Sequence, residues 1–295
     1  MGRAASPSRA GAVLVAALAV FLPGRLFAQG KSNQAHGHAS PPSRSPLPIA
    51  SGAASGIGAM PLAWIDDADL MASGAMSVDL SMTRWQGNGI GETDVPVVNV
   101  AIGLTNRFQF AASLPRVVAN DASGVVGGLG TTYFSGKYAA YANDEYGLKV
   151  AVAPTLEVLG TGVMQSLASG ETRTRFGLPV SVEVDRSGRR FYASAGWFSR
   201  AVWFAGAGAG MQVAPRVGLS ASFSHSWTSV DALTGLTRDR TEVTGGLAYA
   251  LRPSMSVFGS LGRTIATLDE NGAGTTFSGG VSFYISPAAS HRPRQ

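Results

Sequence analysis

The stretch Arg175-Phe-Gly-Leu-Pro-Val-Ser-Val-Glu-Val-Asp185 decides the fold of this chain. Large apolar side chains stand at its even positions, and small, polar or charged ones stand at its odd positions. A period of two indicates a β-strand, because successive side chains point to opposite faces. Strands of globular proteins usually have about five or six residues, whereas a tilted strand needs about 9–11 residues to cross a bilayer. The stretch therefore predicts a strand that crosses a membrane.

The same alternation recurs along the chain. We expect strands over 75–85, 95–104, 107–115, 131–141, 147–158, 172–186, 190–199, 201–213, 216–227, 240–251, 255–265 and 274–285. They predict an all-β fold, a transmembrane antiparallel up-and-down β-barrel of about 12 strands. A soluble sandwich shows the same alternation with its apolar face inside, but its strands are shorter.

The connections between these runs alternate in length, as the turns and loops of outer-membrane barrels do. Short turns follow the second, fourth, sixth, eighth and tenth runs, and longer connections cover 86–94, 116–130, 159–171, 228–239 and 266–273. Both ends of the barrel region then fall on the short-turn side, which is periplasmic in such barrels. The join near Arg200 is the exception, because it is almost absent where a loop is expected. A barrel of ten strands is the alternative.

The first residues have the form of a secretory signal. Arg3 and Arg9 precede an apolar run over 10–22, a Pro-Gly break follows, and Ala28 suits cleavage. We expect a signal peptide over 1–28, a flexible periplasmic linker or lead-in over 29–73, the barrel over 74–286 and a periplasmic tail over 287–295. Within the lead-in, the acidic stretch 61–73 suits a plug, a cap or a simple approach to the barrel.

Composition narrows the class of protein. The chain has no Cys, which excludes disulfides and thiolate metal sites. It contains no run of 18 apolar residues, so helices are not expected to cross the membrane. Residues 1–60 carry five bases and no acid, and the remaining 18 bases and 18 acids cancel. The basic balance therefore gives no reason to expect a nucleic-acid partner. The expected partners are the lipid bilayer and a small-molecule solute, and the expected state is a monomer.

Charged side chains on the polar face are the candidates for lining a pore. They are Lys137, Lys149, Glu157, Arg173, Arg175 and Glu183. Antiparallel pairing is expected to set Glu157 opposite Arg173 or Arg175, and Glu183 and Asp185 close to Arg190. It is also expected to make Lys137 and Lys149 cross-strand neighbours, with Glu183 beside Lys149. Charged rings tune the permeation of charged solutes, whereas ion pairs that only brace a narrow lumen do not. We hypothesise that Arg173 and Arg175 favour anions near the outer mouth.

Other side chains of chemical interest have plainer interpretations. Aromatic residues near the strand ends predict interface girdles: Trp85, Tyr133, Trp197, Trp203, Trp227 and Phe283. His225 and Ser226 match a hydrolase pair only in residue type, since adjacent strand residues point to opposite faces. His36 and His38 form a weak metal candidate in the linker. We expect no catalytic residue, no cofactor and no resident metal.

Two hairpins resemble a known family. Gly103-Leu-Thr-Asn-Arg-Phe-Gln-Phe-Ala-Ala-Ser-Leu-Pro115, and then Gly128-Leu-Gly130 with Lys137-Tyr138, are similar to outer-membrane proteins of the phenol-degradation MetA-pathway type, often described as transporters. The family usually has an Asp where Thr131 stands. The resemblance implies an outer-membrane barrel that takes up small hydrophobic or aromatic compounds, and it supplies no catalytic residues.

Together these observations predict a monomeric outer-membrane channel or diffusion transporter for small molecules. Passage would be passive, with the connections 86–94, 116–130 and 159–171 gating or selecting. The alternatives are a structural or adhesive barrel that transports nothing and, with less support, an envelope lipid hydrolase.

Overall fold

The computed structural model describes residues 66–87, 90–120, 128–160, 173–186, 188–199, 202–228, 239–267 and 273–285. All of them belong to one compact unit, Pro46–Gln295. The expected signal peptide over 1–28, the linker up to residue 65 and the tail over 287–295 lie outside the described residues. Within the described part, no helix has the length and apolar character needed to cross a membrane.

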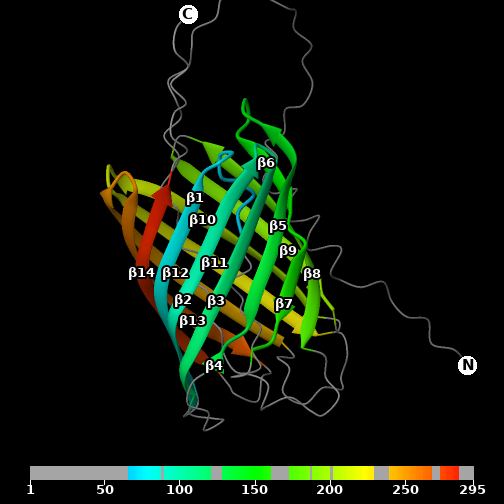
Figure 1. Cartoon of the computed structure of the whole chain (residues 1–295), viewed down its shortest axis with the longest axis vertical. Coiled ribbons are helices and arrows are strands. Elements are labelled where there is room, and N and C mark those ends of the chain that lie inside the picture. The colour runs from blue at the N-terminus through cyan, green and yellow to red at the C-terminus, as the bar shows by residue number, and fades with distance from the viewer. Residues whose placement is uncertain are drawn as a thin grey trace, which may run out of the picture. The chain divides into compact units, whose positions relative to one another are not determined.

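Fourteen strand segments form one antiparallel sheet that closes on itself (Figure 1). They are β1 (Met76–Gly87), β2 (Ile90–Thr105), β3 (Phe108–Asn120), β4 (Gly128–Leu129), β5 (Thr132–Asn143), β6 (Leu148–Val152), β7 (Thr155–Val158), β8 (Thr174–Arg186), β9 (Arg189–Phe198), β10 (Val202–Ala214), β11 (Val217–Thr228), β12 (Asp239–Arg252), β13 (Met255–Thr267) and β14 (Gly274–Ile285). The first and last strands pair along their whole length, from Met76 opposite Ile285 to Gly87 opposite Gly274.

The fourteen segments form a barrel of twelve strands, because β6 and β7 count as one strand and the short β4 is not counted. β6 and β7 are two parts of one strand, because both pair with β5 on one side and β8 on the other. The interruption lies at Ala153-Pro154, where proline has no N–H to donate to the ladder. β4 has two residues and pairs with β3. The predicted closed, 12-stranded antiparallel barrel is confirmed.

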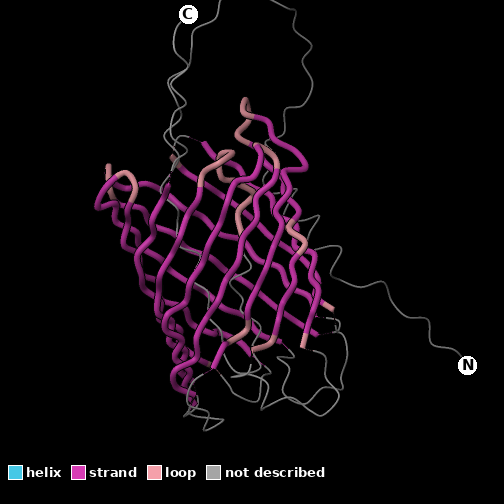
Figure 2. The backbone as a smooth tube through the Cα atoms, in the orientation of Figure 1, coloured by secondary structure: helices cyan, strands magenta, loops and turns pink. Residues whose placement is uncertain are grey.

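The two ends of the barrel differ. The end with the short connections, which we call the turn end, contains the turns after Thr105, Asn143, Arg186, Ala214 and Arg252 (Figure 2). β1 begins and β14 ends at this same end. The opposite end, which we call the loop end, contains the remaining connections. The predicted alternation in length holds for the connections after β3, β7, β11 and β13, whereas the connections after β1 and β9 are short as well.

Outward and inward faces follow the parity of the sequence. On β8, Phe176, Leu178 and Val180 are 49%, 43% and 39% exposed, whereas Ser181 and Glu183 are buried. Large apolar side chains are likewise exposed on the outside of strands all around the barrel, among them Leu80, Leu104, Phe223, Leu247, Leu261 and Phe277. An apolar surface around a polar interior inverts the arrangement of a soluble sandwich, and it suits contact with lipid.

Two predictions about the strand ends have opposite outcomes. The split near Arg200 is confirmed, because β9 and β10 are separate strands with Phe198 opposite Val202. The predicted connection over 86–94 is wrong. There β1 continues to Gly87 and β2 starts at Ile90, with Glu92 opposite Trp85 and Thr93 opposite Arg84. The polar composition of residues 91–94 suggested a loop, but these residues pair within the ladder.

The outer face carries a row of three tryptophans near the loop end. Trp203 of β10 lies directly between Trp197 of β9 and Trp227 of β11. Trp197 and Trp203 have ring centroids 6.5 Å apart. Such a row is typical of the aromatic girdle at a membrane interface. Two other residues predicted for this girdle, Trp85 and Tyr133, instead point into the barrel and are buried.

Candidate functional site

The lumen brings together the charged side chains that point inward from the strands. Most of them gather in two regions, one toward each end of the barrel. In a barrel of this strand number the interior is narrower than in the open 16–18-stranded porins and wider than in filled eight-stranded barrels.

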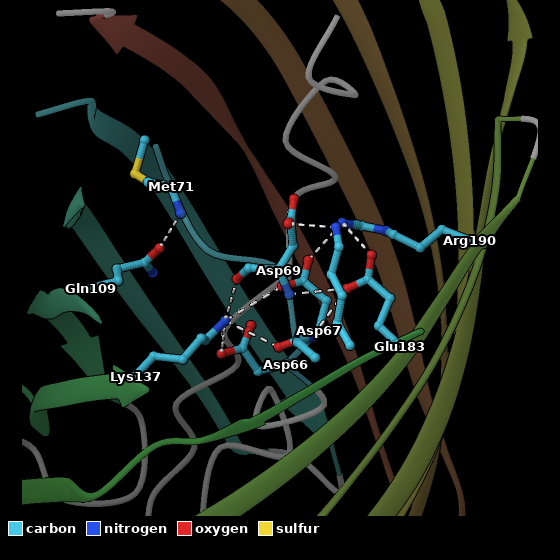
Figure 3. Close-up of polar contacts among 10 residues, drawn as sticks. Asp66, Asp67, Asp69, Met71, Gln109, Lys137, Glu183 and Arg190 are labelled. Atoms are coloured by element: carbon cyan, nitrogen blue, oxygen red, sulfur yellow. Dashed lines mark hydrogen bonds and ion pairs between the residues drawn. The ribbon is translucent and has the colours of Figure 1, made fainter. Parts of the chain in front are cut away.

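A segment of the chain itself lies in the lumen near the turn end. Residues Asp66–Ala75, which we call the luminal segment, precede β1 and contact the inner wall (Figure 3). Their course is fixed by backbone contacts: Gly74 N donates to Gly103 O at 2.7 Å, and Gly103 N donates to Ala75 O at 3.0 Å. A Cβ atom on Gly103 would lie 2.2 Å from the Ala72 carbonyl oxygen. Glycine at this position of β2 is therefore what lets the segment approach the wall so closely.

Three bases on three strands hold the acids of this segment. We call Lys137 of β5, Lys149 of β6 and Arg190 of β9 the basic triad. Lys137 Nζ lies 2.6 Å from an oxygen of Asp66, Lys149 Nζ lies 2.7 Å from an oxygen of Asp69, and Arg190 Nη1 lies 2.7 Å from an oxygen of Asp67. Each base thus has a carboxylate of its own.

Further contacts fix the backbone of the luminal segment. The Lys137 ammonium also donates to the main-chain oxygens of Asp67 and Asp69, at 3.1 and 3.3 Å. One oxygen of Glu183 on β8 accepts from the backbone N–H groups of Ala68 and Asp69, both at 3.1 Å. Gln109 on β3 accepts from the Met71 N–H at 2.8 Å. Figure 3 shows these groups converging on the segment from opposite parts of the wall.

The surroundings shift the acidity of two of these carboxyl groups in opposite directions. Burial raises the pKa of Asp66 above its ordinary value of 3.8, and the attraction of Lys137 offsets this only in part. Burial acts on Asp67 too, but the charges of Lys137 and Arg190 outweigh it and hold the Asp67 pKa below 3.8. Asp67 therefore carries its negative charge at neutral pH, between Lys137 and Arg190.

A second charged group lies at the loop end. Glu157 of β7 and Arg175 of β8 are cross-strand partners, with the Arg175 Nη1 atom 3.8 Å from a Glu157 oxygen. The hydroxyl of Tyr133 on β5 donates to the other Glu157 oxygen at 3.2 Å. All three side chains are buried. They join three neighbouring strands across the inner wall.

The opposite wall at the loop end carries a third group. Arg240 and Glu242 of β12 form an ion pair, and Thr264 of β13 hydrogen-bonds to both of them. The Arg240 guanidinium lies over the ring of Trp85, 5.7 Å from its centroid. This contact explains why Trp85 faces the lumen: its ring packs against a buried base. Arg240 is a lumen residue that the sequence pattern did not single out.

One part of the lumen is apolar. Phe198, Val202 and Phe204 are all buried on the inner face of β9 and β10 at the loop end. The two phenylalanine rings have centroids 6.0 Å apart. Gly177 and Gly196 beside these rings leave the space that they occupy. This cluster narrows the barrel on one side.

Five of the six predicted pore-lining residues face the interior: Lys137, Lys149, Glu157, Arg175 and Glu183. The sixth, Arg173, lies just before β8 and is exposed at the loop end. Glu157 lies opposite Arg175, and Glu183 lies opposite Lys149, as the strand register inferred from the sequence predicts.

One predicted pairing is wrong. Lys137 lies opposite Gln109, and Lys149 lies opposite Ala142, so the two lysines are not cross-strand neighbours. Pairing begins directly beside the turn, with Asn143 opposite Leu148, so Lys149 lies one residue beyond the turn on its strand. Lys137 lies six residues before Asn143 on the facing strand, too far along the ladder to be its neighbour.

The described residues offer little to hydrolytic or metal chemistry. His225 lies on the outside, where its ring stacks on Trp227 and its Nδ1 atom is 2.9 Å from the Thr241 hydroxyl oxygen. Ser226 is buried on the inner side. The two side chains therefore lie on opposite faces of β11, as expected. No group of three potential metal ligands occurs within the described part of the chain, and His36 and His38 lie outside it.

Comparison with known proteins finds solved structures that share the fold. No protein-family model matches the sequence, and no curated protein sequence matches it. Among solved structures, the NanC porin matches with a TM-score of 0.51 at 14% identity over 70% of this chain and 98% of its own. The KdgM porin matches with a TM-score of 0.52 at 9% identity over 71% and 99%.

An outer-membrane channel from Pseudomonas putida F1 matches with a TM-score of 0.52 at 16% identity, over 75% of this chain and 98% of its own. At these identities the likeness shows the shared barrel fold. The resemblance to the phenol-degradation type therefore stays a prediction.

Proposed function

We propose that this chain is a passive channel of an outer membrane, through which small polar solutes diffuse. The observation that carries the proposal is the closed barrel whose interior is lined by charged side chains toward both ends and whose outside is apolar. A polar lumen lowers the cost of moving a hydrated solute across the bilayer, because the wall replaces part of the hydration shell. The structural neighbours are porins and channels, which supports the same interpretation.

The outside of the barrel supports its placement in a membrane. Exposed apolar side chains surround it, and Trp197, Trp203 and Trp227 mark one interface near the loop end. In outer-membrane barrels the short turns are periplasmic, so the turn end would face the periplasm. The luminal segment then lies toward the periplasmic side. A monomer, with lipid and a small solute as its partners, is the simplest state.

The lumen favours polar or charged solutes over most of its length. The apolar cluster of Phe198, Val202 and Phe204 is the part that suits the hydrophobic or aromatic solutes implied by the family resemblance. Phenyl rings on one side of a constriction contact a flat ring well. Comparing the passage of a neutral sugar with that of an aromatic acid of similar size decides between these solute classes.

One observation favours an alternative function. The luminal segment fills part of the interior near the turn end, and ion pairs hold it there. A barrel closed in this way would serve as a structural or adhesive protein and transport nothing. The lipid hydrolase alternative has no comparable support, since His225 and Ser226 face opposite sides.

Conductance decides between the channel and the closed barrel. The protein is first shown to migrate differently on a gel before and after boiling, as a folded barrel does. It is then reconstituted in a planar bilayer and in liposomes loaded with sugar. The channel proposal predicts discrete current steps and swelling in small sugars that declines with sugar size. A correctly folded barrel that gives neither current nor swelling, even when Asp66, Asp67 and Asp69 are changed to Asn, contradicts the proposal.

A further inference from the structure

The basic triad is a site that the chain itself fills. Its three bases come from β5, β6 and β9, far apart in the sequence, and each binds a carboxylate of the luminal segment. The Lys137 and Arg190 side chains are 6% and 10% exposed. A base this deeply buried costs free energy unless an anion accompanies it. With the segment in place these bases are shielded from water, and the carboxylates of the segment supply the anions that this burial requires.

The wall itself does not neutralise the triad. Two acids of β8 lie beside it: Glu183 opposite Lys149, with one of its oxygens 4.0 Å from Arg190, and Asp185 opposite Arg190. Among the triad and these two neighbours on β8, three bases and two acids leave one positive charge. Lys137 is the base farthest from these acids in the sheet, since its cross-strand partner is Gln109. Without the luminal segment, Lys137 would depend on a solute for a counter-charge.

We infer that Lys137, Lys149 and Arg190 form a binding site for small solutes that carry several carboxylates, and that Asp66, Asp67 and Asp69 occupy it in the absence of such a solute. This inference rests on the proposed channel function, because it names the class of solute that the lumen takes. The segment acts as an internal competitor. A solute that displaces it also removes the obstruction at the turn end.

The geometry favours a polycarboxylate over a single carboxylate. Three carboxylates meet the three bases, and although Asp67 reaches both Lys137, at 3.4 Å, and Arg190, a single carboxylate such as acetate leaves at least one base without a counter-charge. Glu183 also accepts two backbone N–H groups from the segment, both at 3.1 Å. A ligand that replaces the segment must bring a donor to this oxygen, or Glu183 loses its hydrogen bonds. Citrate meets both needs, because its carboxylates can pair with the bases and its hydroxyl group can donate to Glu183.

The segment is a strong competitor because it is tethered. It joins β1 directly at Met76, so its carboxylates stay near the triad whenever they detach. Short tethers give effective concentrations of about millimolar. Citrate is therefore expected to bind the natural chain weakly, and to bind more tightly once the segment has lost its charges.

Calorimetry of the whole chain in detergent micelles tests the site without requiring conduction. Sodium citrate is titrated into the natural protein and into the variant D66N/D67N/D69N, at one ionic strength. We expect the variant to bind citrate at least about tenfold more tightly, since the tethered competitor no longer neutralises the triad. Adding K149M to this variant is expected to reverse the gain. Lys149 is chosen because its side chain is 28% exposed and thus the least buried of the three bases.

Two controls distinguish citrate binding at the basic triad from an effect of net charge and from the binding of a single carboxylate. The variant D144N/E145Q also removes acids, but from the exposed turn between β5 and β6, and it is expected to bind citrate like the natural chain. Acetate is expected to gain no affinity in the Asn variant. Each variant is checked by its gel shift on boiling. If the triple variant does not fold, D66N/D69N replaces it, because those two side chains are more exposed than that of Asp67.

The outcomes separate this inference from the channel proposal. Equal citrate affinity in the natural chain and the Asn variant overturns the inference, and so does a gain that persists in the presence of K149M. If the variants bind citrate as expected but carry no current, the site stands and the channel proposal falls. If both proteins conduct and citrate affinity does not change, the channel stands and the site falls.

Discussion

Replacing Phe223 by arginine tests whether the outer face of the barrel meets lipid. Phe223 is the seventh residue of β11, a strand of 12 residues, so it lies near mid-height. Its side chain is 49% exposed on the outside. If the barrel spans a membrane, this position faces the hydrocarbon core, and a guanidinium there loses its hydration.

The cost can be worked from the exposed surface. A phenylalanine side chain has about 150–250 Å², so roughly 100 Å² of Phe223 meets lipid, and losing that contact costs about 2.5 kcal/mol at 25 cal/mol per Å². An arginine at the midplane of a barrel adds about 2–4 kcal/mol. We therefore expect F223R to lower the free energy of unfolding by about 4.5–6.5 kcal/mol. The same change at Leu219, the third residue of β11, should cost clearly less, because the penalty falls toward the interface.

Reversible urea unfolding in lipid vesicles, followed by tryptophan fluorescence, measures both variants. The natural chain, F223R and L219R are compared at one lipid composition, and each variant's m-value is checked for constancy. In a water-soluble barrel both positions would tolerate arginine with little change in stability. A loss below about 1 kcal/mol at Phe223, or an equal loss at both depths, would refute the membrane assignment.

Two further predictions concern the lumen. A Cβ on Gly208 would lie 2.4 Å from the ring of Tyr192, so G208A is expected to lower the unfolding free energy by about 1–3 kcal/mol. A Cβ on Gly245 would have nothing within 4 Å, so G245A is expected to be neutral or slightly stabilising in the same urea experiment. R175M leaves the buried carboxylate of Glu157 without its base, so the cation-to-anion permeability ratio, measured from reversal potentials, should rise. Adding E157Q should return the ratio to that of the natural chain. An unchanged ratio in R175M would show that this pair does not act on permeating ions.

Local pattern was sufficient for much of the fold. The alternation along β8 gave its outward and inward faces correctly, because strand parity is a property of the backbone and needs no distant contact. The same parity also marks Trp85 as an inward residue, since it shares a face with Asp79 and Thr83. The prediction that Trp85 belongs to an outer girdle relied on its position near a strand end and overlooked this signal.

Other features required the tertiary structure. Asp67 and Arg190 are separated by 123 positions, and the luminal segment has no periodicity from which to derive its place. Its three aspartates are equally consistent with a plug, a cap or a lead-in. The strand register also leaves no mark in the sequence, and the pairing of Asn143 with Leu148 decided that Lys137 and Lys149 are apart.

The sequence by itself determined most of the strands, their two faces and five of the charged residues of the interior, because the alternation of side chains is set by local backbone geometry. Only the closed barrel decided which charges meet. Closing the sheet brings β5, β6 and β9 around one interior and turns an acidic stretch before β1 into the counter-charge of three bases. Attraction between such groups depends on distance in space and on exclusion of water, and neither of these is written in the order of the residues.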